Sequence, residues 1–291
     1  MTSDRSNPRR QAGPAHGRLA EAARRRAASV RSVLRIARAL FSSQYALMLE
    51  YRAEIVLWAL SGLLPLLMFS LWSNAPAGAA SGLSPQAFAR YFLAAFVVRQ
   101  FTIVWVVYAF EEDNLLGRLS PYLLQPLPLV WRYVAAHLAD QATRLPIVII
   151  MVALFFLFVP SAFWIPSFGQ FLLAVLAIQL GFWLNFLLHY AITLLCFWSE
   201  RARALEKLLY MPYLFLSGLL APLDLYPAAL RTFALHTPFA AMLYLPAQLL
   251  SGGPVDLLAG LLNAVSWLLL LLPLNLWLWR AGVRRYAAMG A

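Results

Sequence analysis

The sequence predicts an all-α polytopic membrane protein with six transmembrane helices. Of its 291 residues, 62% are hydrophobic and 12% are charged, whereas soluble proteins carry about 25% charged residues. Several runs approach the roughly 20 apolar residues needed to cross a hydrocarbon core of about 30 Å. We also expect an interfacial amphipathic helix near the N-terminus, a short helix in a cytoplasmic loop and a re-entrant helical pair before the last span.

The N-terminal arm, residues 1–28, is polar, rich in arginine and predicted to be disordered. From Val30 onward, apolar residues and arginines separate onto two faces of a helix. The apolar face comprises Val30, Val33, Leu34, Ala37, Leu40 and Phe41, and the basic face Arg31, Arg35 and Arg38. Such a helix lies in the membrane interface with its arginines toward anionic headgroups. It is either a plain membrane anchor or an elbow that also touches a cytoplasmic partner.

Residues 29–291 are expected to form a single membrane domain. The predicted spans are about 54–72, 88–110, 145–159, 168–198, 208–223 and 257–279. Pro65 is expected to kink the first span. Residues 224–250 are too broken by prolines for a full span and too apolar for a free loop. We expect two short helices there that dip into the outer leaflet.

The distribution of arginine and lysine predicts the orientation. Basic residues gather in the N-terminal arm, the 111–144 and 199–207 segments and the C-terminal tail, whereas the 73–87 and 160–167 loops contain none. By the positive-inside rule, both termini are cytoplasmic, which agrees with an even number of spans.

The loop between the second and third predicted spans has a distinctive composition. It opens with three acids, Glu111 to Asp113, which are either a solvated face or a contact for a partner. Gly117 is expected to supply a backbone conformation that other residues resist. The pair Ser120-Pro121 indicates an N-cap followed by the first helical residue, and prolines 126 and 128 end the helix.

The next segment, 131–144, is expected to be a helix that is still partly exposed to water. His137, Asp140 and Arg144 are spaced three and four residues apart, which places them on one face of that helix.

Arg99 is the sharpest candidate for a functional residue inside a span. An arginine at the bilayer centre costs about 2.5–3.5 kcal/mol on insertion scales, so its side chain should face protein or water. It lines either a substrate path or a subunit interface, or it makes a structural contact, for which Glu54 is a partner if the spans are staggered.

Asn185, His189 and Thr193 form a polar stripe with a spacing of four residues on the fourth span. Such residues most often hydrogen-bond helices together, and a role in binding substrate or protons is the alternative. At the outer surface, His236 and Asp224 suggest acid/base chemistry, but helix capping is the simpler interpretation because no nucleophile pattern accompanies them.

Two stretches, GRLSPYLLQPL at 117–127 and SGLLAPLDLYPAALRTFALHTPF at 217–239, carry a resemblance to the membrane subunits of type-2 ABC exporters, the ABC-2-type permease family. The resemblance implies a dimer of permease subunits in a bacterial inner membrane, with the substrate path along the dimer interface, paired with a separate ATPase that holds ATP and Mg²⁺. It also implies a coupling helix in the 111–130 loop. The residues expected to contact the ATPase are Glu111, Glu112, Asp113, Gly117, Arg118, Leu119, Ser120 and Pro121, and those expected in the path or interface are Arg99, Asn185 and His189.

The subgroup that the first stretch resembles includes exporters of cationic toxic compounds. An arginine in the path would repel a cationic substrate. The placement of Arg99 in the path therefore conflicts with a cationic substrate. The direction of transport, export, also follows from the resemblance alone.

Several classes of function are disfavoured by what the sequence lacks. No G-x-x-x-x-G-K-[ST] loop occurs, so ATP phosphates cannot be held by that device. The single cysteine, Cys196, allows neither a disulfide within the chain nor a cysteine metal site. The net charge of +11 is explained by cytoplasmic arginines and does not require nucleic acid. A membrane-embedded enzyme, built from Arg99, Asn185, His189, Asn263 and Asn275, and an ion-driven secondary transporter remain as alternatives.

Overall fold

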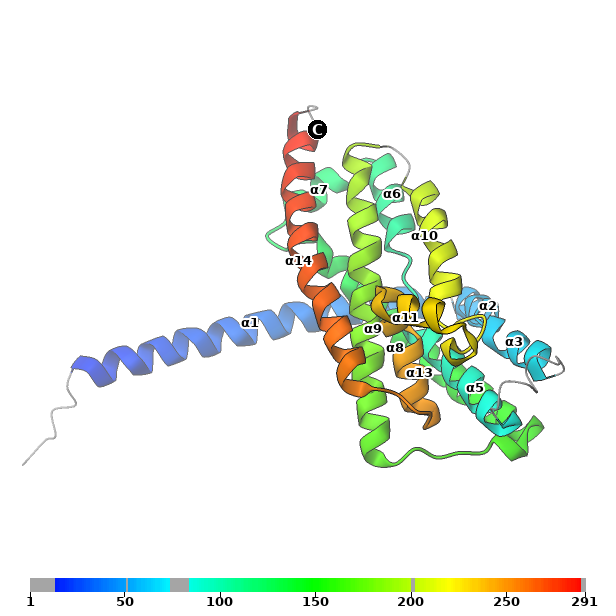
Figure 1. Cartoon of the computed structure of the whole chain (residues 1–291). Helices are drawn as coiled ribbons and strands as arrows, with labels where there is room; N and C mark the ends of the chain where they lie inside the picture. Colours follow the sequence, from blue (N-terminus) through cyan, green and yellow to red (C-terminus); the bar gives the residue numbers. More distant parts are fainter. Residues whose placement is uncertain (1–13, 51, 74–83, 200–201, 289–291) are drawn as a thin grey trace, which may run out of the picture.

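The computed structural model describes residues 14–50, 52–73, 84–199 and 202–288, and every regular element in these ranges is a helix. Figure 1 shows long helices that run side by side and one helix, α1, that runs crosswise to them. The described residues contain four helices long and apolar enough to cross a membrane, or five if a bent pair counts as one span.

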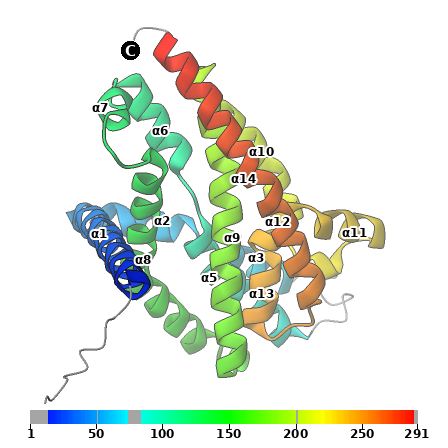
Figure 2. The same cartoon turned by 90° about the vertical axis from the view of Figure 1, so that its left-hand side faces the viewer.

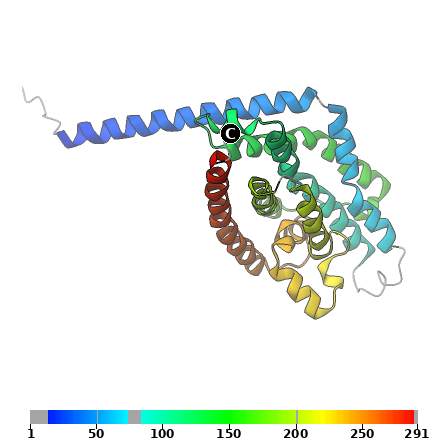
Figure 3. The same ribbon diagram turned by 90° about the horizontal axis from the view of Figure 1, so that it is seen from above.

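Helix α1 spans Pro14–Glu50 and packs against α8. It begins inside the arm for which we expected disorder, while residues 1–13 lie outside the described residues. Figure 3 shows α1 passing along one edge of the body and projecting beyond it. On its described part, Val33 and Leu34 of the predicted apolar face are 60% and 63% exposed, as expected for a face that meets lipid.

The predicted first span is interrupted more strongly than by a kink. It consists of α2 (Arg52–Ser61) and α3 (Leu64–Ser73), separated by a turn at residues 62–63. Pro65 lies in the first turn of α3, where a proline costs no hydrogen bond. Each helix has 10 residues and is therefore about 15 Å long, so neither crosses a hydrocarbon core alone.

The predicted second span is also divided, at a position that contains no glycine or proline. Helix α5 (Pro85–Thr102) begins with Ser84 as its N-cap, and α6 (Val106–Leu115) follows after an unwound segment at Ile103–Trp105. The two helices together form one membrane-span candidate, Pro85–Leu115.

The short helix of the cytoplasmic loop is present as α7, Leu119–Leu123, but its predicted start is wrong. Arg118, not Ser120, occupies the N-cap position, and neither residue caps the helix with its side chain. The Ser120 hydroxyl instead lies 2.9 Å from the hydroxyl of Tyr286. Gly117 has a φ of +69°, which confirms the backbone conformation expected of it.

Helix α8, Leu129–Phe158, is continuous and contains Pro146. This one helix contains both segment 131–144, which we expected to be partly exposed to water, and the predicted third span, 145–159. That expectation is wrong for the three residues on which it rested, because His137, Asp140 and Arg144 are all buried. They face the break between α5 and α6 rather than water.

After the short 3-10 turn η1 (Pro160–Ala162), helix α9 spans Phe168–Leu194 and opens with a capping box formed by Ser167 and Gln170. The 3-10 turn η2 (Leu195–Phe197) extends α9 to the end of the fourth predicted span. Figure 2 shows α9 passing through the middle of the bundle, where it contacts α5, α6, α12, α13 and α14.

Helix α10, Arg203–Leu216, begins earlier and ends earlier than the predicted fifth span, 208–223. After the 3-10 turn η3 (Leu223–Leu225), the chain forms α11 (Ala228–His236), α12 (Pro238–Met242) and α13 (Tyr244–Ser251). A bend of 71° separates α11 from the α12–α13 unit, and α12 and α13 are almost entirely buried. The last helix, α14, spans Leu257–Ala288 and therefore continues beyond the predicted end of the sixth span at residue 279.

Candidate functional site

The unwound segment between α5 and α6 is supported by side chains from two neighbouring helices. Breaking a helix frees backbone carbonyls and N–H groups that need new partners inside a membrane. Gln141 of α8 donates to the carbonyl of Phe101 at 2.7 Å, and Asn185 of α9 donates to the carbonyl of Thr102 at 2.7 Å. The freed groups are therefore bonded by residues that lie 40 and 83 positions away in the sequence.

Trp105 closes the unwound segment. Its backbone N–H donates to Nε2 of His137 at 3.0 Å, and its indole N–H donates to Asp140 at 3.2 Å. The indole and imidazole rings stack with centroids 4.3 Å apart. The Asp140 carboxylate also pairs with Arg144 at 2.9 Å, so the charges of this pair cancel beside the break.

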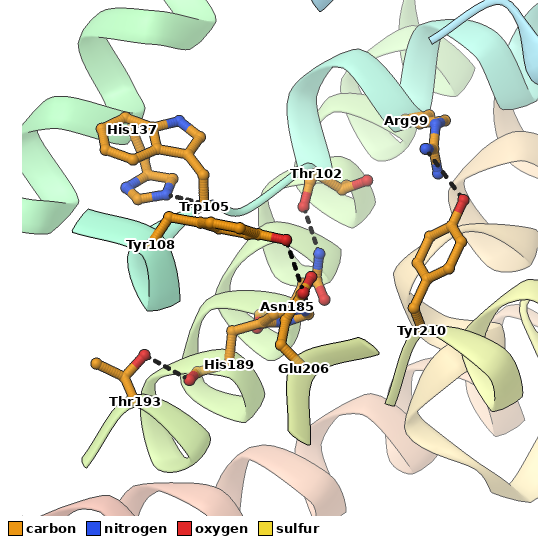
Figure 4. A network of polar contacts seen from close by, with 10 residues as sticks. All are labelled: Arg99, Thr102, Trp105, Tyr108, His137, Asn185, His189, Thr193, Glu206 and Tyr210. Carbon is orange, nitrogen blue, oxygen red and sulfur yellow. Dashed lines mark hydrogen bonds and ion pairs between the residues drawn. The ribbon is translucent and has the colours of Figure 1, made fainter. Parts of the chain in front are cut away.

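A cavity of about 600 Å³ opens at this break. Its walls come from α1, α2, α5, α6, α8, α9 and α10 as well as the unwound segment. The lining residues of main interest are Glu54, Arg99, Trp105, Tyr108, Glu112, Asn185, His189, Glu206, Tyr210 and Tyr213. Figure 4 shows the polar side chains around the break, drawn from α5, α6, α8, α9 and α10.

The three residues expected in a path or interface, Arg99, Asn185 and His189, all line this cavity. Arg99 lies in the last turn of α5. Its guanidinium donates to the Tyr210 hydroxyl at 3.5 Å and also interacts with the Tyr213 hydroxyl. Its Nε atom is buried without a partner. Glu54 lines the same cavity, but no ion pair between it and Arg99 is found in the described part of the chain.

The polar stripe on α9 has a mainly structural role at its first and last positions. Asn185 supports the break, and the Thr193 hydroxyl donates to the carbonyl of His189 at 2.8 Å. His189 lies between them with Nδ1 2.9 Å from the carbonyl of Asn185 and Nε2 4.0 Å from Glu206.

Glu206, Tyr108 and Tyr210 belong to the site but were not singled out from the sequence. Tyr108 donates to Glu206 at 3.0 Å. Glu206 was assigned to a polar loop at 199–207, whereas α10 already begins at Arg203 and points Glu206 into the cavity. A capping pattern at Arg203 would have revealed this, but the helix has no side-chain cap.

The three acids at the end of α6 differ in their surroundings. Glu111 is buried and pairs with Arg203 at 3.1 Å, and Asp113 is buried and pairs with Arg118 at 2.6 Å. Glu112 is exposed and also pairs with Arg118, at 2.9 Å. The expected solvated face therefore holds for Glu112 alone. Hydrogen bonds to Glu112 and Asp113 raise the pKa of the Arg118 guanidinium.

The surface of the same loop is apolar beside these charges. Leu119 anchors α7 and is fully buried, whereas Leu115, Leu116 and Leu124 are 60%, 61% and 87% exposed. Pro121 is also exposed. Figure 1 shows α7 beside the C-terminal end of α14, where Ser120 meets Tyr286.

The acid/base pair suggested for the outer surface is not assembled. Asp224 accepts hydrogen bonds from Arg231, Tyr244 and Gln248, while Nδ1 of His236 faces the carbonyl of Thr232. Among the described residues, no group of three or more His, Cys, Asp or Glu side chains could hold a metal ion.

The fold and the site define a multi-pass α-helical membrane protein with a polar cavity at a broken helix, which are features of a membrane permease. Residues 59–290 match the family of ABC-2 family transporter proteins, and the chain belongs to that family. Comparisons with curated proteins and with solved structures gave no match.

Proposed function

We propose that this chain is the transmembrane permease subunit of an ATP-driven exporter. It forms the substrate path as a dimer in a bacterial inner membrane, with six membrane passages and both termini in the cytoplasm. α2 with α3, and α10 with the segment after it, supply the two passages that no single long helix supplies. ATP and Mg²⁺ are bound by a separate ATPase subunit, and this chain carries out no covalent chemistry.

The observation that carries the proposal is a continuous connection from the cytoplasmic loop to the cavity. Helix α6 lies directly between α7 and the break at Ile103–Trp105. Trp105 and Tyr108, at the start of α6, line the cavity, and Glu111 to Asp113, at its end, hold the loop. A force applied to α7 therefore reaches the cavity wall through ten residues of helix.

The loop has the properties of a protein-binding surface. Three exposed leucines near α7 lie at the end of the molecule where arginines gather, which is the end that faces the cytoplasm by the positive-inside rule. Exposed apolar side chains in water mark contact sites for another protein. The ATPase is the partner that we assign to this surface, with Glu112 and Pro121 at the contact.

Affinity purification of the chain from its native membrane in mild detergent, with mass spectrometry and an ATPase assay, tests this proposal. We expect a protein with a Walker motif in stoichiometric amount, together with ATP hydrolysis. If the chain purifies without any ATPase, the proposal is wrong. A membrane-embedded enzyme or an ion-driven secondary transporter would then be the better interpretation.

A further inference from the structure

The charged groups that line the cavity are not all neutralised by one another. Asp140 pairs with Arg144 at 2.9 Å, and Glu112 pairs with Arg118 at 2.9 Å. The first pair contributes little net charge to the cavity, and the exposed Glu112 shares Arg118 with Asp113 at the loop end of α6. The groups that remain are Arg99, Glu206 and, at the start of α2, Glu54.

Arg99 differs from four other arginines of the described chain. Arg118, Arg144, Arg203 and Arg231 each pair with a carboxylate. In the described part of the chain, Arg99 has no such pair. Among the described residues its partners are two hydroxyls, that of Tyr210 at 3.5 Å and that of Tyr213, and its buried Nε has none. A planar guanidinium with free donors facing a cavity is suited to a carboxylate, phosphate or sulfonate group of a ligand.

Glu206 is the negative counterpart. It accepts a hydrogen bond from Tyr108, and its nearest basic group among the described residues is Nε2 of His189, 4.0 Å away. Because Nδ1 of His189 lies 2.9 Å from a carbonyl, that nitrogen carries the ring proton and Nε2 is free of one in the neutral ring. In the described part of the chain, Glu206 is therefore a cavity carboxylate without a basic group closer than 4.0 Å.

Aromatic side chains line the cavity together with these two charges. Trp105, Tyr108, Tyr210 and Tyr213 belong to the lining. In Figure 4, Arg99 and Tyr210 lie to one side of the group, whereas Glu206, Tyr108 and His189 lie together around Asn185. Aromatic faces near a carboxylate such as Glu206 attract organic cations. The positive charge of Arg99 attracts an anionic group instead. The cavity thus offers separate subsites for an anionic and a cationic group.

We propose that the cavity binds a zwitterionic ligand with an apolar or aromatic body, its anionic group on Arg99 and its cationic group on Glu206. The proposal rests on the proposed transport function and adds the chemical class of the substrate. It also removes the conflict between Arg99 and a purely cationic compound, because the arginine then recognises the second charge of the ligand.

The ligand chemistry has two natural sources. A soluble zwitterion would enter from water, whereas the phosphate and ammonium groups of a zwitterionic phospholipid would enter from the membrane. Both place the same two charges in the cavity, and the choice of lipid in the experiment distinguishes them.

The test is a binding measurement on the full chain in nanodiscs of phosphatidylglycerol, which lacks a cationic headgroup. Three soluble probes share a naphthyl body: a sulfobetaine, a trimethylammonium and a sulfonate. We expect the sulfobetaine to bind about tenfold more tightly than either singly charged probe, since each charge-assisted contact adds of that order. Equal binding of the three probes, or binding of none, overturns the proposal.

Two substitutions assign the charges to their subsites. Arg99→Gln should weaken binding of the sulfobetaine about tenfold. It should leave the affinity for the trimethylammonium probe unchanged or higher, and this retained binding also shows that the cavity is folded. Glu206→Gln should weaken the sulfobetaine and spare the sulfonate. Arg231→Gln, which removes an arginine of α11 that pairs with Asp224 and is not among the residues lining this cavity, is the matched control and should leave the binding of all three probes unchanged. A loss of all three probes in Arg99→Gln to the same degree contradicts the assignment.

Nanodiscs that contain phosphatidylethanolamine separate the two sources. If this lipid weakens binding of the sulfobetaine to the wild-type protein but not to Arg99→Gln, the natural ligand is a lipid headgroup. If the lipid does not change binding of the sulfobetaine, the natural ligand is a soluble compound. The co-purification of an ATPase is independent of all these measurements. A stoichiometric ATPase with no preference for the sulfobetaine therefore refutes the ligand class alone.

Discussion

The backbone N–H of Trp105 donates to Nε2 of His137 at 3.0 Å, and the two rings stack at 4.3 Å. This contact fixes the tautomer of the histidine: Nε2 accepts, so Nδ1 carries the proton and donates to the carbonyl of Tyr133 at 2.7 Å. A neutral imidazole of α8 thus joins the start of α6 to the rest of the bundle.

His137→Phe should destabilise the protein by about 1–3 kcal/mol. The phenyl ring keeps the stacking partner of Trp105 but removes the acceptor, which leaves a buried N–H without a partner. Thermal unfolding of the purified chain, followed by tryptophan fluorescence, measures the effect. His236→Phe, at an exposed histidine, is the control. Equal stability of the two variants would show that the Trp105 N–H has found another acceptor.

Gly181→Ala should destabilise the contact between α9 and α12. A Cβ atom at Gly181 would lie 2.8 Å from the carbonyl oxygen of Met242 and 3.2 Å from that of Ala241, so the backbone must shift, at a cost of about 1–3 kcal/mol. Gly169→Ala is the matched control on the same helix, because a Cβ there meets nothing within 4 Å. The control should be stabilised slightly, and a gain in both variants would contradict the close contact.

Gly117→Pro and Glu112→Arg should uncouple ATP hydrolysis from transport without preventing membrane insertion. Proline fixes φ near −65°, whereas Gly117 has +69°, so α7 is displaced. Glu112→Arg replaces an ion pair with a like charge beside Arg118. ATPase activity and ATP-dependent transport are measured together in proteoliposomes, with Glu50→Arg at the exposed end of α1 as the control. Transport that survives both changes would show that the 111–130 loop does not couple the subunits.

Tyr286→Phe tests the link between α7 and α14. The substitution removes the hydroxyl that lies 2.9 Å from Ser120 but keeps the ring against Phe197, at a centroid distance of 5.9 Å. We expect a loss of stability of about 1 kcal/mol or less and a clear decrease in ATP-dependent transport. Tyr226→Phe, which removes a hydroxyl bonded to the carbonyl of Phe215, should leave transport unchanged. If the two variants transport equally, the Ser120–Tyr286 contact has no part in coupling.

The sequence was sufficient where a local signal determines the structure. The length of the apolar run predicted the fourth span, which is α9. Pro65 predicted an interruption close to the start of α3, and the glycine at position 117 predicted a positive φ there. The prolines between 224 and 250 predicted two short helices, whereas the structure has three there, α11, α12 and α13.

The break at Ile103–Trp105 could not be predicted in the same way, because no glycine or proline lies near it. The run Thr102-Ile103-Val104 is β-branched and therefore only weakly opposed to a helix. The break is stabilised by side chains from distant parts of the sequence, namely His137, Gln141 and Asn185. For the same reason, the sequence predicts that Arg99, Asn185 and His189 belong to a path or interface but does not predict that Glu206 lies in the same cavity.

Nucleotide binding to the partner ATPase should change access to the cavity at the break. Tyr210→Cys in a Cys196→Ala background places a single thiol in the lining, because Cys196 is the sole cysteine of the sequence. The measurement is its rate of labelling by a membrane-impermeant maleimide from each side of proteoliposomes that contain the ATPase, with and without ATP and vanadate. We expect labelling from the cytoplasmic side to slow, and labelling from the opposite side to accelerate, when nucleotide is trapped on the ATPase. Rates that do not respond to nucleotide on either side would contradict it.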